Sequence, residues 1–127
     1  MFKKLLIGVI VSSLLVVSVT ACGIREASTT GGPTVHMGAD FFLQPSIAIR
    51  KGDTLTLVDD STAPHLITNG SWINGLAKPG KETGAPAVYQ PFNGNDSATI
   101  GPFNTLGIYH LYCTIHQSMN LKVIVTA

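Results

Sequence analysis

The sequence has few charged residues and only two cysteines. Asp, Glu, Lys and Arg make up 12% of its 127 residues, whereas hydrophobic residues make up 45%. From Gly23 onward there are six basic and seven acidic residues and no basic run, so this part of the chain has nothing to neutralise nucleic-acid phosphates. A chain of this length can bury one modest core. We therefore expect a single domain with no nucleic-acid partner.

The sequence also lacks any stretch of ten or more residues with the spacing of an amphipathic helix. Polar and apolar residues instead alternate over 46–50, 54–57 and 121–126, which predicts half-buried strands. Turn signals separate the apolar segments, for example Lys51-Gly52-Asp53 and Asn74-Gly75. These patterns predict an all-β sandwich or barrel with a long irregular excursion around residues 70–95.

The N-terminus has the pattern of an export signal. Met-Phe-Lys-Lys is followed by 17 uncharged residues, Leu5 to Ala21, and then by Cys22. The stretch contains several Ser and Thr and is short for a permanent span, which needs about 20 apolar residues. Val19-Thr20-Ala21-Cys22 resembles the bacterial lipobox, in which the chain is cut before the Cys and that Cys is lipidated. An ordinary signal peptide cut nearby and an uncleaved anchor are the alternatives.

We accordingly predict a lipoprotein signal peptide over 1–21, a lipidated Cys22 with a flexible tether over 22–33, and a domain over 34–127. The tether is polar and rich in Gly, Ser and Thr. The protein would be exported and anchored to the bacterial cell membrane, facing the extracytoplasmic side. A lipidated Cys22 cannot form a disulfide with Cys113, whose thiol would then be vulnerable to oxidation unless a metal occupies it.

Potential metal ligands are concentrated near the C-terminus, where Cys113, His116 and Met119 lie within seven residues. Apolar residues predict a strand that ends at Cys113 and another that starts near Leu121. A type 1 copper site needs a thiolate, two imidazoles and a weak axial thioether. His65, which follows Pro64 after a predicted strand, offers the missing imidazole. We predict that His65, Cys113, His116 and Met119 bind one copper ion.

Each of these residues taken alone is more often structural, because a lone Met usually belongs to a core and a buried Cys behaves as a small hydrophobe. Their joint order and spacing favour the metal site. His36 and His110 lack such a context, and we expect both on strand faces.

Pro64-His65, followed near the C-terminus by the pattern Gly-x-Tyr-x-x-x-Cys-x-x-His-x-x-Met, resembles the cupredoxins, especially the plastocyanin and amicyanin types. The resemblance covers about residues 34–126. It implies a Greek-key sandwich and a monomer that shuttles single electrons between transient redox partners without catalysing a reaction. It also implies that His116 is the ligand at the solvent edge. Its neighbours would then form a mostly apolar patch, for which Pro64 and Gln117 are candidates.

Two positions depart from that family pattern. Leu66 stands where plastocyanin and amicyanin have Asn, so a bracing side chain is absent, although the Leu66 N–H remains available to the Cys113 sulfur. Ile115 stands where they have Pro, which adds a second N–H near the sulfur. Hydrogen bonds to a thiolate withdraw electron density from it, so we predict a reduction potential above the plastocyanin type.

Other kinds of protein fit the sequence less well. Copper oxidases and nitrite reductases need further histidines, commonly as His-x-His, and none occurs here. Structural zinc sites prefer more Cys or His than this loop offers. The main alternative is a lipoprotein that traffics or buffers copper, and a metal-free sandwich would require all four residues to be incidental.

Overall fold

The computed structural model describes residues 32–127, which form nine strands and no helix. The strands are β1 (Thr34–Met37), β2 (Ser46–Arg50), β3 (Leu55–Asp59), β4 (His65–Ile73), β5 (Leu76–Pro79), β6 (Tyr89–Phe92), β7 (Ser97–Ile100), β8 (Gly107–Cys113) and β9 (Asn120–Thr126). The all-β prediction is confirmed. Across these residues, no helix is long and apolar enough to cross a membrane. The predicted signal peptide, Cys22 and most of the tether lie outside the described residues.

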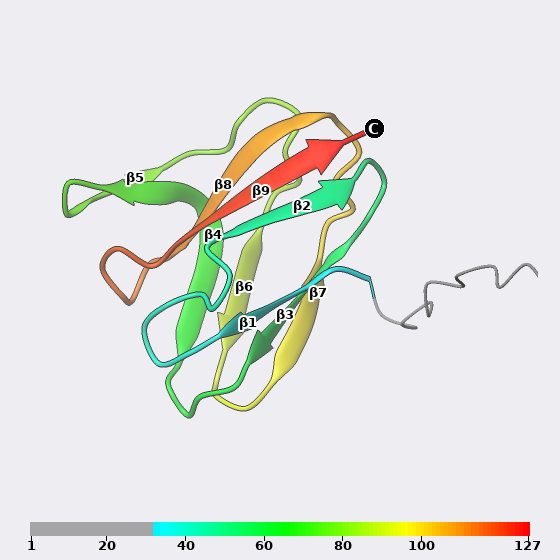
Figure 1. The fold of residues 1–127 in the computed structure, drawn as a ribbon. Coiled ribbons are helices and arrows are strands. Elements are labelled where there is room, and N and C mark those ends of the chain that lie inside the picture. The colour runs from blue at the N-terminus through cyan, green and yellow to red at the C-terminus, as the bar shows by residue number, and fades with distance from the viewer. Residues whose placement is uncertain (1–31) are drawn as a thin grey trace, which may run out of the picture.

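Two sheets pack face to face (Figure 1). One has the order β1-β3-β7, and the other has the order β2-β9-β8-β4, with β5 and β6 both pairing β4. β1 is parallel to β3 and β2 is parallel to β9, whereas the other pairs are antiparallel. The structure is therefore a sandwich, as predicted.

Period-two alternation explains the core. Leu55 and Leu57 of β3 are fully buried while Thr56 between them is not, and Val123 of β9 is fully buried between the less buried Lys122 and Ile124. The inner faces of both sheets contribute to one hydrophobic cluster. Burying such side chains stabilises the fold by about 1.5 to 3 kcal/mol each.

The predicted excursion at 70–95 is more regular than expected. β4 continues to Ile73, and an Asn74-Gly75 turn leads into β5, which pairs with the end of β4. β6 pairs with the start of β4, leaving residues 80–88 and 93–95 irregular. All four residues of β5 are exposed, so the strand shows no alternation of burial that the sequence could reveal. Figure 1 shows the β4–β5 hairpin projecting from the body of the sandwich.

Candidate metal centre

One pole of the sandwich brings the predicted ligands together. His65 is the first residue of β4, and Cys113 is the last residue of β8. The antiparallel register pairs Ile67 with Cys113. Since His65 and Ile67 point to the same face of β4, His65 is a diagonal neighbour of Cys113 on the inner face. Both side chains are buried.

The nitrogen and sulfur atoms converge on one point. The Cys113 Sγ lies 3.7 Å from Nδ1 of His65 and 3.5 Å from Nδ1 of His116. All three donor atoms lie within 4.8 Å of one another. Metal bonds of about 2.0 to 2.3 Å in a trigonal plane hold their donors roughly 3.5 to 4 Å apart. The spacing therefore suits a single ion bound by a thiolate and two imidazoles.

Met119 lies beside these residues because the loop folds back on itself. The Cys113 N–H donates to the Met119 carbonyl at 3.0 Å, and the Met119 N–H donates to the His116 carbonyl at 3.3 Å. Ser118 turns the chain with a φ of 66°. The Met119 side chain is 1% exposed, but its role as the axial ligand stays a prediction.

His65 is held in its neutral form by its surroundings. Burial lowers the pKa of His65, and the charge of a protonated His116 would lower it further, while Asp59 and the Gly38 carbonyl oppose the change. Only the neutral imidazole can bind a metal. The site is therefore ready to bind without first losing a proton from His65.

The β4–β5 hairpin contacts the ligand loop directly. The Trp72 indole N–H donates to the Cys113 carbonyl at 2.8 Å. The Asn120 side chain accepts from the Trp72 N–H at 2.7 Å and donates to the Trp72 carbonyl at 3.0 Å. At the hairpin turn, the Gln117 amide donates to the Gly75 carbonyl at 3.1 Å. These hydrogen bonds hold the loop against a paired strand.

No family model matches this chain, and no curated protein matches it. Among solved structures, amicyanin from Paracoccus versutus superposes with a TM-score of 0.60 at 23% identity, covering 76% of this chain and 83% of amicyanin. A Cu(I) form of an amicyanin mutant gives 0.58 at 23% identity with the same coverage of both chains. A reduced amicyanin mutant gives 0.57 at 21% identity, covering 76% of this chain and 84% of the mutant.

The chain has the cupredoxin fold. The predicted resemblance is thus confirmed for the fold, which is all that such low identities establish. Within this cupredoxin fold, His65, Cys113 and His116 are placed to form a copper site, because their atoms provide the required thiolate and imidazoles in one place.

Leu66 and Ile115 flank the site in this cupredoxin fold. The Leu66 carbonyl accepts a hydrogen bond from the Thr114 N–H at 2.9 Å, which ties the start of β4 to the ligand loop. Ile115 is 53% exposed. Within residues 32–127, the hydrogen-bonding neighbours of the Cys113 sulfur are the two imidazoles. Hydrogen bonds from the Leu66 and Ile115 N–H groups to this sulfur are not among them, so these two donors stay predictions.

Sequence reasoning missed three residues at the site, namely Asp59, Trp72 and Asn120. Asp59 ends β3, and its Oδ1 lies 3.5 Å from Nε2 of His65. The one available signal was its position in the alternation of β3. Asp59 lies two residues after Leu57, which places both side chains on the buried face of the strand. Trp72 and Asn120 had no such signal, because their partners come from distant parts of the chain.

The remaining histidines lie on strand faces, as predicted. Nδ1 of His36 in β1 lies 2.7 Å from a carboxylate oxygen of Asp60, and Nδ1 of His110 in β8 lies 2.7 Å from one of Glu82. Both imidazoles are about two-fifths exposed. Neither joins the group formed by His65, Cys113 and His116.

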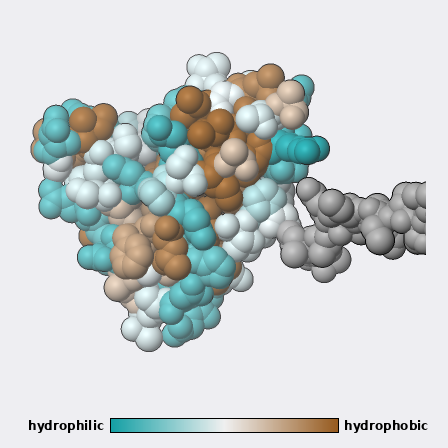
Figure 2. Space-filling model, in the orientation of Figure 1, coloured by the Kyte–Doolittle hydropathy of each residue, from teal (hydrophilic) through white to brown (hydrophobic). Residues whose placement is uncertain are grey.

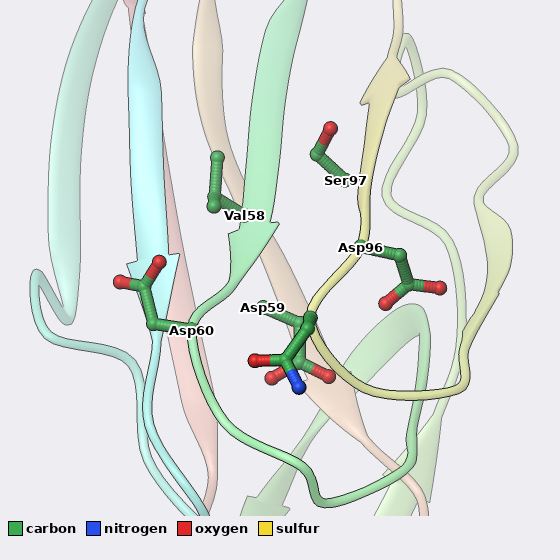
Figure 3. A pocket seen from close by; sticks show the side chains of 6 residues that line it. Val58, Asp59, Asp60, Asp96 and Ser97 are labelled. Atoms are coloured by element: carbon green, nitrogen blue, oxygen red, sulfur yellow. The ribbon is translucent and has the colours of Figure 1, made fainter.

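A hollow of about 310 Å³ lies near the end of β3, lined by Val58, Asp59, Asp60, Asn95, Asp96 and Ser97. In Figure 3 the labelled side chains of Asp60 and Asp96 lie on opposite sides of the hollow. Asp60 faces His36, and the Asp96 oxygens accept hydrogen bonds from the backbone N–H groups of Asn93 and Gly94. The carboxylates therefore do not converge on one point, and the hollow is not a cation site.

Proposed function

We propose that this protein binds one type 1 copper ion and carries single electrons between redox partners. The observation that supports this most directly is the buried Cys113 sulfur, with an imidazole nitrogen on each side at 3.7 and 3.5 Å. A copper ion bound there would alternate between its two oxidation states by gaining and losing one electron. We infer no catalytic role for the protein itself.

The chain's part is to hold the ligands still. Cys113 is fixed by the β4–β8 ladder, and His65 is fixed by the pairing of β4 with β6, where it lies opposite Phe92. His116 and Met119 are fixed by backbone hydrogen bonds within the loop. Met119 would supply the weak axial thioether. A site whose ligands move little on electron transfer needs little reorganisation.

His116 would be the route for electrons, because it is partly exposed while His65 is buried. Exposed apolar side chains occur close by in sequence and on the adjoining hairpin, namely Ile115 at 53%, Ile73 at 50% and Leu76 at 62%. Figure 2 shows hydrophobic residues beside hydrophilic ones at the end of this hairpin. Segments 61–77 and 113–121 contain no Asp, Glu, Lys or Arg. The expected partner face is therefore apolar and uncharged, and docking is weak and transient.

We further propose that the protein acts as a monomer outside the cytoplasm, held to the membrane by a lipid on Cys22. The support is the sequence of the export signal and lipobox. Copper trafficking or buffering is the alternative function. The full burial of His65 and Cys113 disfavours it, because a site that exchanges metal readily needs accessible ligands.

The test is the visible spectrum of the oxidised, copper-loaded full-length protein in detergent. Intense blue or green colour is expected in the wild type and in Cys22→Ser, and its loss is expected in Cys113→Ser. A colourless wild type that binds copper would overturn the proposal. Rapid copper transfer to a chelator without reversible redox cycling would favour the trafficking alternative.

A further inference from the structure

Asp59 is a carboxylate buried at the metal end of β3. The residue is 1% exposed, and its side chain and that of His65 are both fully buried. In the described part of the chain, His65 is the one basic group within ion-pair distance of Asp59. A buried acidic group without a Lys or Arg partner is unfavourable unless another charge compensates it.

The contacts of Asp59 fix its position behind the imidazole. Oδ1 accepts hydrogen bonds from the Ser61 N–H at 3.0 Å and from the Ser61 hydroxyl at 2.8 Å, and it lies 3.5 Å from Nε2 of His65. Oδ2 of Asp59 and Nε2 of His65 are buried and have no hydrogen-bond partner. The fold thus places a carboxylate with one unpaired oxygen beside a ring nitrogen that has no hydrogen-bond partner.

The two nitrogens of His65 face opposite groups. Nδ1 faces the Cys113 sulfur, whereas Nε2 faces Asp59. A carboxylate next to Nε2 favours the tautomer that carries its proton there, which leaves the Nδ1 lone pair free for a metal. This arrangement orients the ring and makes it a stronger electron donor.

The charges also distinguish the two oxidation states. A divalent ion bound by one thiolate would carry a net positive charge, which the Asp59 carboxylate would neutralise. A monovalent ion with the same thiolate is already neutral, so the carboxylate leaves a net negative charge in a buried region. Because burial weakens dielectric screening, the carboxylate favours the divalent state.

We propose that Asp59 is a positioning residue that orients His65 and lowers the reduction potential of the bound copper. This inference rests on the proposed function. It assigns the compensating charge of the site to β3, a strand of the opposite sheet from those that carry the ligands.

The test compares Asp59→Asn with Asp60→Asn in the full-length, copper-loaded protein. Both variants remove one carboxylate, but Asp60 is about half exposed and faces His36. The expected result is a higher midpoint potential and altered Cu(II) electron paramagnetic resonance parameters in Asp59→Asn, with both unchanged in Asp60→Asn. A purely structural role for Asp59 would lower stability without this selective rise in potential.

Ser61→Ala provides a second route if Asp59→Asn does not fold. It removes the hydroxyl that holds Oδ1 and keeps the charge, so we expect altered resonance parameters with a smaller change in potential. If the wild type is blue but neither Asp59→Asn nor Ser61→Ala changes the potential or the spectrum, this inference fails and the proposed function stands. If the wild type forms no blue centre, the proposed function itself fails.

Discussion

The indole nitrogen of Trp72 lies 2.8 Å from the carbonyl oxygen of Cys113 and donates a hydrogen bond to it. This contact joins the β4–β5 hairpin to the residue that supplies the thiolate. Leu66 cannot brace the ligand loop with an amide side chain. Hydrogen bonds between the hairpin and the loop region hold it instead, from Trp72 to Cys113, from Gln117 to Gly75 and between Trp72 and Asn120. The loop is therefore supported by hydrogen bonds within the chain itself.

Trp72→Phe should loosen the ligand loop. The change keeps an aromatic ring but leaves the Cys113 carbonyl without its donor, which costs about 1 to 3 kcal/mol in a buried setting. Denaturant unfolding of the metal-free protein, followed by circular dichroism, measures this loss. Amide hydrogen exchange at 114–119 should also accelerate. Tyr89→Phe, at a residue 75% exposed, is the control. Equal effects in both variants would show that the Trp72 hydrogen bond does not support the ligand loop.

Gly75→Ala should disturb the metal site more than Gly52→Ala. Both glycines have positive φ, 76° and 92°, so each alanine costs about 1 kcal/mol in backbone strain. A Cβ at position 75 would lie 2.7 Å from the Gln117 amide nitrogen, whereas one at position 52 has nothing within 4 Å. Denaturation should show similar losses of stability, and only Gly75→Ala should change the copper spectrum. Identical spectra would mean that the turn does not position the loop.

Ile115→Pro should lower the reduction potential. Proline removes the N–H that we expect near the Cys113 sulfur, so the thiolate would donate more electron density and favour the oxidised state. Redox titration of the wild type and the variant provides the comparison, with Ile115→Val as a control that keeps the N–H. An unchanged or higher potential in the proline variant would contradict the predicted hydrogen bond.

The metal-free protein should lose stability as the pH falls below about 6.5, the ordinary pKa of histidine. Burial lowers the pKa of His65 in the folded state, so the unfolded chain takes up a proton first. The loss begins near 6.5 and continues until the pH passes the lowered pKa. Denaturation of the metal-free wild type across this range should show the slope, and His65→Gln should reduce it. A slope that His65→Gln leaves unchanged would assign the effect to other groups.

Much of the fold could be predicted because the alternation of side chains is local. The strands around 46–50, 55–59 and 120–126 lie where period two places them, and β8 ends at Cys113 as the apolar run indicated. The excursion at 70–95 was predicted less well. β5 is exposed along its length and is held through its pairing with β4, so its sequence carries no burial pattern.

The candidate ligands Cys113, His116 and Met119 could be grouped from the sequence alone, because seven residues of one loop cannot separate them far. Placing His65 with them required the β4–β8 register. Asp59, Trp72 and Asn120 belong to the site through contacts between residues 6 to 48 positions apart in the chain. The sequence by itself determined which ligands are available and where the strands with alternating side chains run. Only the tertiary structure decided what surrounds the ligands, because burial and cross-strand contacts depend on how the two sheets and the hairpin pack.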